Sequence, residues 1–355
     1  MEIQPILSER IGHFALEPEL LLCRRATEPR RRRKTLFFVS GPVSNRYLLA
    51  MWRRALPFGP AWLLQPIHLA SSRFPWVDLG AQGWDVRHFD LRALDLVDPQ
   101  LDFTSEEIAR GQRLLAALGI PEGSPYVCLA ARDTAYLQGV DAARDWSYHD
   151  YRNSDIRTYA SMAHWLANRG YFVLRMGSSF THRFVSECPM VIDYAASPHR
   201  SDFADVFLYA NCDFSISTAT GVDSLAMVFR RPMGLVNFTS NGGFQLGSHL
   251  RMLMLKDFID LETGARIDLL SARYLEAMQV YRTEDFRKLG IAVLDNTPED
   301  LTDFARELVE LLEGSWVPSI EHQARESAVL TRWGEIDDLS AASFHLPQGW
   351  LRARM

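Results

Sequence analysis

The segment 203–237 constrains the fold more than any other part of the chain. Apolar residues predict strands at Phe214–Ser217 and at 233–236, with a helix over 222–229 between them. A strand, a helix and a second strand at this spacing are typical of a parallel βαβ unit. The segment therefore predicts an α/β protein with a parallel sheet.

The turn between the first strand and its helix consists of small and hydroxylated residues. Thr218, Thr220, Gly221 and Ser224 leave room for a phosphate group at the helix start, where backbone N–H groups favour anions. The same residues also suit a plain helix cap, because threonine and serine are common capping residues. The turn is thus a candidate diphosphate site, with simple capping as the alternative.

Length and turn signals predict two α/β domains. A chain of 355 residues that is 47% hydrophobic is long enough for more than one core. Because 121–125 is rich in Pro and Gly, we expect an N-terminal α/β domain at 1–120 and a second α/β domain at 121–296. A helix and tail at 297–355 would pack back on the body. Two facing domains with a cleft between them follow from this division.

Local signals define several elements. Ser44 or Asn45 is expected to cap a helix over 46–56, and Thr104 and Thr297 match helix starts. The segments 62–69 and 84–89 are interpreted as short strands, and 244–289 as a polar, amphipathic section.

Polar residues follow the strands of the second half, where ligands collect in parallel sheets. Arginine grips phosphate through a two-point fork, although a salt bridge or loop contact explains each arginine equally simply. The candidate diphosphate-binding residues are Arg132, Asp133, Arg152, Asn153, Arg175 and Gly177, together with the turn. Asp193 and Asn237 are candidates for a sugar or ribose hydroxyl.

His13 is the candidate general base, with Glu17 as a second candidate. Histidine commonly deprotonates a hydroxyl at neutral pH, although an isolated surface histidine is the commoner case. Glu19 and Asp78 are lesser candidates.

Composition excludes some classes of protein. The net charge of −6 disfavours nucleic-acid binding, and the four cysteines have no metal-like spacing. The N-terminal residues do not form a signal peptide, and no apolar run is long enough for a membrane span. We therefore expect a cytoplasmic protein, with the basic run at 30–34 either a solvated arm or a peripheral contact with the inner face of the membrane. Motifs for dinucleotide binding, P-loops, serine hydrolases and zincins are absent, which leaves a metal-free anion site.

Five sequence blocks resemble a family of bacterial proteins taken to be glycosyltransferases. In order they read IGHFALEPELLL, SNRYLLAMWRR, YVCLAARD, YRNSDIRTYASMAHWLANRGYFVLRMG and DFSISTATGVDSLAMVFRRPMGLVN. The resemblance covers roughly residues 10–240. The C-terminal part is more distantly similar to the nucleotide-binding half of heptosyltransferases and GDP-fucose-dependent fucosyltransferases, both of the GT-B fold. Arg132 would take the place of the fucosyltransferase arginine that contacts the donor diphosphate, although the histidine of that motif is missing here.

The resemblance implies transfer of a sugar from a nucleoside diphosphate sugar to an acceptor hydroxyl on a glycan, a lipid-linked carrier or a protein. It also implies that no metal and no cofactor other than the donor is needed, and that the setting is surface glycan synthesis. Two other functions stay open: a sugar-nucleotide epimerase of the same architecture, and a non-catalytic nucleotide-binding or scaffold protein.

Overall fold

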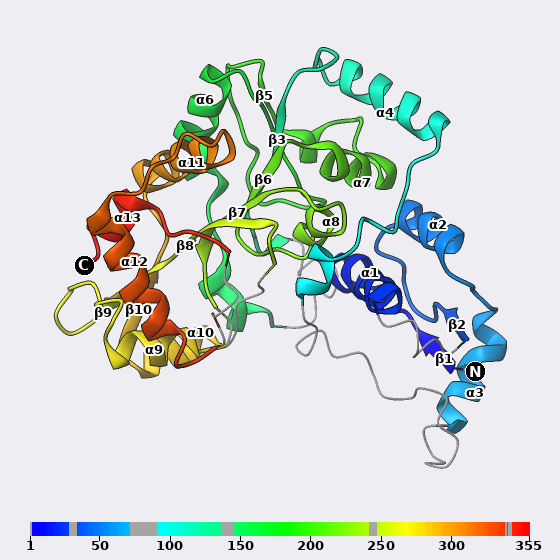
Figure 1. Ribbon diagram of the computed structural model, residues 1–355, viewed down its shortest axis with the longest axis horizontal. Helices are drawn as coiled ribbons and strands as arrows, with labels where there is room; N and C mark the ends of the chain where they lie inside the picture. Colours follow the sequence, from blue (N-terminus) through cyan, green and yellow to red (C-terminus); the bar gives the residue numbers. More distant parts are fainter. Residues whose placement is uncertain are drawn as a thin grey trace. The chain divides into compact units, whose positions relative to one another are not determined.

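The computed structural model describes residues 2–27, 34–71, 91–135, 145–240, 247–337, 339 and 343–355. The chain divides into two compact units (Figure 1). Unit 1 comprises Met1–Leu115, Ser201–Asn211 and Gly221–Arg231, and unit 2 comprises Ala116–Arg200, Cys212–Thr220 and Pro232–Met355. The chain therefore returns twice from unit 2 to unit 1. The domain boundaries expected from the sequence stay a prediction.

Unit 2 contains a six-stranded parallel sheet with the strand order β5-β4-β3-β6-β7-β8. Most strand residues are buried, as expected for a parallel sheet covered on both faces. The α/β class with a large parallel sheet is thus confirmed. The strands are β3 (Tyr126–Ala130), β4 (Phe172–Arg175), β5 (Val191–Ile192), β6 (Phe214–Ser217), β7 (Met233–Phe238) and β8 (Leu250–Leu255).

Helices and an antiparallel pair complete unit 2. In Figure 1, α11 lies beside α6, and both belong to this unit. Thr297 caps α11 in a capping box with Asp300, as the sequence predicts. The short strands β9 (Asp257–Asp260) and β10 (Ile291–Leu294) pair with each other. The helices are η4 (Ser147–Arg152), η5 (Ile156–Tyr159), α6 (Ala160–Asn168), η6 (Tyr194–Ala196), α9 (Ala272–Met278), α10 (Thr283–Lys288), α11 (Pro298–Leu312), α12 (Ile320–Trp333) and α13 (Gln348–Arg352).

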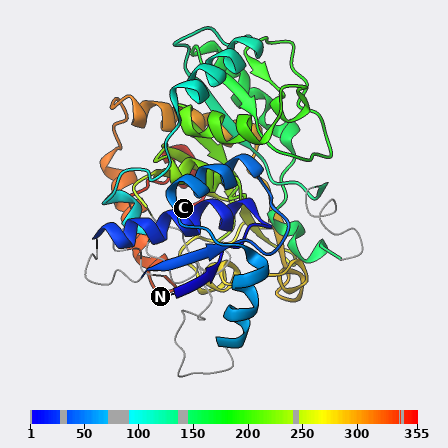
Figure 2. The same cartoon turned by 90° about the vertical axis from the view of Figure 1, so that its right-hand side faces the viewer.

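Unit 1 is mainly helical around one small parallel pair. Figure 2 shows β1 (Glu2–Pro5) beside β2 (Thr35–Phe38), and the two strands pair with each other in parallel. The helices are α1 (Ile11–Thr27), α2 (Arg46–Ala55), α3 (Ala61–Ser71), η3 (Leu91–Asp95), α4 (Ser105–Ala117, which ends just inside unit 2), α7 (Asp202–Asn211) and α8 (Asp223–Val228).

Close packing explains why α7 belongs to unit 1. The ring of Phe207 lies so near Gly111 of α4 that a Cβ there would come within 1.9 Å of it, so only glycine fits. Asn45 accepts a hydrogen bond from the backbone of Leu48 and donates one to the carbonyl of Asp202 at the start of α7. The first of these bonds is the helix cap that the sequence predicts.

Two local predictions differ from the structure. The segment 62–69 lies inside the helix α3, because packing against β1 and β2 decides between a helix and a strand where the apolar pattern fits both. The section expected to be polar contains β8, whose run Met252–Leu255 is fully buried next to β7. The strand predicted at 84–89 lies outside the described residues.

Candidate active site

Arg132 lies just beyond β3, beside the end of β6. Its backbone N–H donates to the Thr218 hydroxyl at 2.8 Å, and its carbonyl accepts from Ser154 N at 2.9 Å. These bonds exist because β3 and β6 are neighbouring parallel strands, so that their carboxyl ends meet. The Thr218 side chain therefore fixes the Arg132 backbone.

Arg152, the last residue of η4, reaches the same turn from the other side. Its guanidinium donates to the Ala219 carbonyl at 3.0 Å, and Ala219 has a positive φ of 56°. Burial raises the pKa of the Tyr151 hydroxyl, whereas the positive charges of Arg152 and Arg132 lower it. The positive charges of both arginines thus act on the same group, the Tyr151 hydroxyl, in unit 2.

Lys256 is a third cation of this group, and the sequence analysis did not find it. It is only 2% exposed, and its ammonium contacts the Asn153 carbonyl and, at 2.7 Å, the Asp295 carboxylate. Burial and the nearby charge of Arg152 lower its pKa, and Asp295 acts in the opposite direction. The sequence feature that could have identified Lys256 is its position directly after the apolar run of β8, in a chain with few lysines.

A buried amide network holds these strand ends together. Asn237 has a positive φ of 48° and donates through its amide to Ser154 Oγ and the Tyr159 hydroxyl. Its backbone N–H and side-chain oxygen both pair with Asn296, whose amide donates to the Leu255 carbonyl. The Asn237 side chain is therefore engaged within the protein, and its expected contact with a sugar or ribose stays a prediction.

Arg175, Asp193 and Asp133 order loops at the adjacent strand ends. Arg175 is 3% exposed and pairs with Asp193 at 3.2 Å, and the other Asp193 oxygen accepts from Phe184 N. Asp133 accepts from the backbone N–H groups of Ala135 and Thr181.

Gly177, with a φ of 140°, directs its carbonyl to Arg200. These contacts match the structural alternative given for Arg175 and Asp133, and the expected ligand contacts of Arg175, Gly177, Asp133 and Asp193 stay predictions.

His13 and Glu17 form a dyad on α1, in unit 1. His13 Nδ1 lies 2.7 Å from Glu17 Oε1, and Glu17 is buried while about a third of the His13 side chain is exposed. The spacing of four residues places both on one face of the helix. A buried carboxylate on Nδ1 orients the ring and leaves Nε2 for a substrate.

The start of α1 packs against the start of α8. A Cβ on Gly12 would lie 3.2 Å from Gly221 Cα and 3.5 Å from Ser224 Oγ. His13 is therefore adjacent in sequence to the residue that touches the expected phosphate turn.

The helix α8 is a weaker anion site than its sequence suggests. It spans six residues, its N-cap Val222 makes no side-chain cap, and its first turn contains the buried carboxylate of Asp223. A short helix gives a small dipole, and a carboxylate there opposes a phosphate. The arginines and Lys256 are thus better suited to bind an anion than the helix start.

Glu19 has a structural role. It is fully buried and pairs with Arg230 at 2.8 Å, and Arg230 also donates to the carbonyls of Leu94 and Val97. Burial raises the pKa of Glu19, and Arg230 partly offsets this. The other lesser candidate, Asp78, lies outside the described residues.

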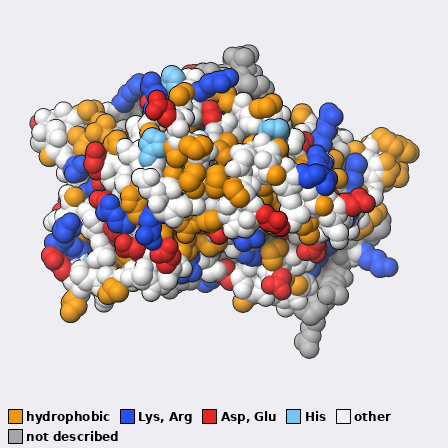
Figure 3. Space-filling model, turned by 90° about the horizontal axis from the view of Figure 1, so that it is seen from above, with side chains coloured by type: hydrophobic (Ala, Val, Ile, Leu, Met, Phe, Trp, Pro, Cys, Tyr) orange, Lys and Arg blue, Asp and Glu red, His pale blue; other side chains and the backbone are white. Residues whose placement is uncertain are grey.

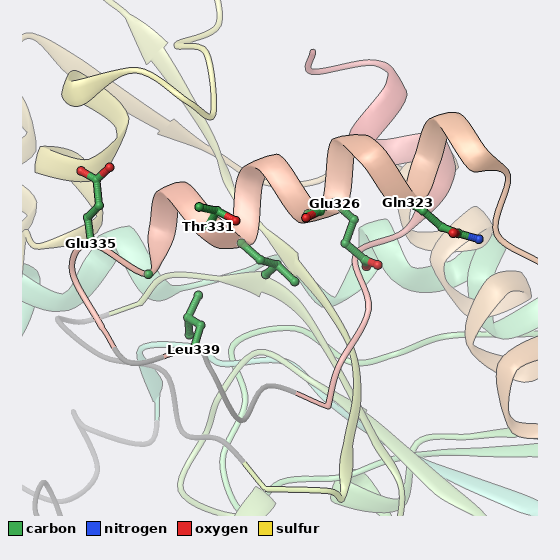
Figure 4. A pocket seen from close by; sticks show the side chains of 8 residues that line it. Gln323, Glu326, Thr331, Glu335 and Leu339 are labelled. Carbon is green, nitrogen blue, oxygen red and sulfur yellow. The ribbon is translucent and has the colours of Figure 1, made fainter.

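A shallow cavity along α12 differs chemically from the strand-end group, which comprises Arg132, Arg152 and Lys256. It measures about 620 Å³ and is lined by Gln323, Glu326, Ser327, Leu330, Thr331, Gly334, Glu335 and Leu339 (Figure 4). Its charged lining residues are both carboxylates, which would repel an anionic nucleotide. None of the predicted site residues lines it.

Charged side chains are mixed on the surface. On the face shown in Figure 3, acidic and basic side chains are scattered among apolar ones. Binding to nucleic acid usually needs a basic patch or stripe. The expectation that nucleic acid is not a partner stays a prediction.

Comparisons with known proteins connect the chain to glycosyltransferases by shape only. No family model matches the sequence, and no curated protein does. Among solved structures, the ADP-heptose lipopolysaccharide heptosyltransferase II of E. coli is 14% identical, with a TM-score of 0.48 over 88% of this chain and 100% of that one. The dodecameric iron-containing heptosyltransferase TibC, in complex with ADP-D-β-D-heptose, is 14% identical, with a TM-score of 0.38 over 87% of this chain and 76% of that one.

A glycosyltransferase family 9 protein from Veillonella parvula is 13% identical, with a TM-score of 0.26 over 63% of this chain and 62% of that one. The similar structures are thus heptosyltransferases and a family 9 member, in line with the sequence resemblance. Because these TM-scores lie below 0.5, the function has to be argued from the site itself.

The expectation of no metal and no cofactor is contradicted and withdrawn. Two of the similar structures, both of TibC, are described as iron-containing. In the part of this chain that the structure describes, no three His, Cys, Asp or Glu side chains come together to hold a metal ion. The described residues therefore do not provide a fitting iron site.

Among the described helices, none has both the length and the apolar character needed to cross a membrane.

Proposed function

We propose that this protein transfers a sugar from a nucleoside diphosphate sugar to an acceptor hydroxyl, in an architecture of the GT-B type. The observation that carries the proposal is the group of three cations in unit 2: Arg132, Arg152 and Lys256. They lie at the carboxyl ends of a parallel sheet, which is the usual ligand-binding edge. With Asp295 offsetting one charge, the group keeps a positive surplus that suits a diphosphate.

The chemistry of the leaving group explains why cations are needed. When the glycosidic bond breaks, negative charge grows on the departing diphosphate. Thr218 and Ser154 fix the Arg132 backbone, and the Ala219 carbonyl holds the Arg152 guanidinium, so little reorganisation of this segment is required as that charge develops. Preorganised groups of this kind stabilise the transition state more than the ground state.

The His13–Glu17 dyad supplies the second function that the reaction needs. His13 Nδ1 is occupied by Glu17, so we assign proton transfer to Nε2, which takes the proton of the acceptor hydroxyl as that oxygen attacks the sugar. Glu17 stabilises the imidazolium that forms. The acceptor is a glycan, a lipid-linked carrier or a protein.

A thermal-shift screen tests the donor site. The purified chain is melted with GDP, UDP, ADP, CMP and dTDP, each with and without added divalent metal. A ligand that binds only the folded state adds about 2.7 kcal/mol at a hundredfold excess over its Kd. We expect the melting temperature to rise selectively with one nucleoside diphosphate and to rise less with the monophosphate CMP.

Turnover and metal content complete the test. The sugar donor of the selected base is incubated with and without acceptors, and conversion without any acceptor would instead indicate an epimerase. Elemental analysis of the purified protein checks whether this chain contains iron, as the TibC structures do. If no nucleotide raises the melting temperature, the donor site is wrong and a non-catalytic role takes its place.

A further inference from the structure

The outer face of α3 is apolar and exposed. Trp62, Ile67 and Leu69 are 78%, 40% and 57% exposed, and Leu63 is 45% exposed. Trp62, Pro66 and Leu69 follow the spacing i, i+4, i+7 and so share one side of the helix. A run of large apolar side chains on one exposed helical face usually marks an interaction surface.

The inner face of α3 explains why this orientation is fixed. Leu64 is 4% exposed and packs with Ile3 and Phe38 of the small sheet. His68 Nδ1 lies 2.9 Å from the Ile3 carbonyl, and its ring packs edge-on against Phe38. The helix is therefore held on β1 and β2 by Leu64 and His68. The apolar outer face is not needed for this packing.

Charge is distributed very unevenly along the chain. The first 71 residues contain 11 basic and 5 acidic residues, although the whole chain has 38 basic and 44 acidic residues. Two of those five acids, Glu17 and Glu19, are buried. The exposed Lys34 directly precedes β2, on which α3 packs. The apolar face thus belongs to the basic part of an acidic protein.

We propose that the outer face of α3 docks on an anionic lipid surface. Interfacial helices combine an apolar face with nearby basic groups, and tryptophan favours the boundary between headgroups and acyl chains. Basic residues near such a surface add attraction to anionic lipids, whereas the acidic remainder of the chain is repelled. The contact would therefore form through this part of unit 1.

The charge pattern favours a lipid surface over a second copy of the chain. In a two-fold dimer the same patch contacts itself, so that two identical basic regions would face each other. Like charges close together oppose such a contact, whereas anionic headgroups neutralise them. The proposal does not depend on the glycosyltransfer reaction, because docking is measured without donor or acceptor.

Vesicle co-sedimentation tests the proposal with the full chain. Phosphatidylcholine vesicles are compared with vesicles that also contain phosphatidylglycerol, at low and high salt. We expect binding to the anionic vesicles that weakens with salt. The double variant Trp62→Ser, Leu69→Ser should bind at least about tenfold more weakly, because two large apolar side chains no longer enter the interface.

A matched variant controls for the general loss of exposed apolar residues. Val317 and Ile320 of unit 2 are 80% and 87% exposed, so Val317→Ser, Ile320→Ser removes a similar apolar area elsewhere. We expect this variant to bind vesicles as the wild type does, and both variants to keep the wild-type melting temperature.

Three outcomes would overturn the proposal: no vesicle binding by the wild type, equal binding by both double variants, or equal binding to both kinds of vesicle. Light scattering adds a fourth outcome. A wild-type dimer that the Trp62, Leu69 variant turns into a monomer would assign the α3 face to a second copy.

Discussion

The strand-end group of unit 2 and the dyad of unit 1 are built in opposite ways. Arg132, Arg152 and Lys256 come from separate elements, and each is held by a contact with a residue distant in the sequence. His13 and Glu17 are four residues apart on one helix and need only that helix to form their contact. The first arrangement depends on the whole sheet, whereas the second is local. A substitution in the first group should therefore change binding, and one in the second should change only the chemical step.

The largest expected effect belongs to the dyad. His13→Ala should lower kcat by about 10²–10⁴-fold, the range typical of a lost general base, and leave donor affinity unchanged. Glu17→Gln should lower kcat less and shift its pH profile, because the imidazolium loses its carboxylate. Steady-state kinetics and calorimetric titration with the diphosphate separate the two effects. A loss of donor affinity in His13→Ala would contradict the proposal that the dyad acts only in the chemical step.

A smaller effect is expected for donor binding. Arg152→Ala should weaken nucleoside diphosphate binding by about 30–160-fold, since a charge-assisted hydrogen bond contributes about 2–3 kcal/mol. Arg157→Ala is the matched control, because Arg157 lies nearby in the sequence, in η5, and pairs with Asp155 at the surface. Calorimetric titration measures both. Equal affinities for the two variants would show that Arg152 only orders the turn at Ala219.

The smallest effect concerns the region around α12, which we place outside the site. Burial alone would raise the pKa of Glu326, but the His322 ring, 3.7 Å from Oε1, and hydrogen bonds from His345 and the Leu346 N–H outweigh it and lower the pKa from 4.5 to about 2. The unfolded chain therefore binds more protons between these values. This contribution to stability is present above pH 4.5 and is lost as the pH falls towards 2.

Glu326→Gln should thus lower the free energy of unfolding at neutral pH by about 2 kcal/mol. The free energy of unfolding of this variant should also fall less steeply as the pH is lowered. Urea titrations at several pH values measure both changes. Donor affinity should stay as in the wild type. A clear loss of affinity in this variant would move the binding site towards the cavity along α12.

Much of the fold was readable because its signals are local. The capping residues Asn45 and Thr297 identify their helices from neighbours within three residues, and the apolar runs of β3 and β6 identify buried strands. The segment 62–69 was misjudged because apolar residues in a short window fit both a strand and a helix. Only its packing on the small sheet decides between them.

The sequence alone determined the class of the fold and most of the candidate residues for the chemistry. It specified an α/β chain, polar residues at strand ends, and a histidine four residues before a glutamate, since each of these is set by composition and spacing. The tertiary structure decided which of those residues act together. The order of the strands places Arg132 beside Thr218, and the fold buries Lys256 at the end of β8. The aspartates at 133 and 193 are drawn into loop contacts, because their neighbours in space, unlike those in sequence, are fixed only when the sheet has formed.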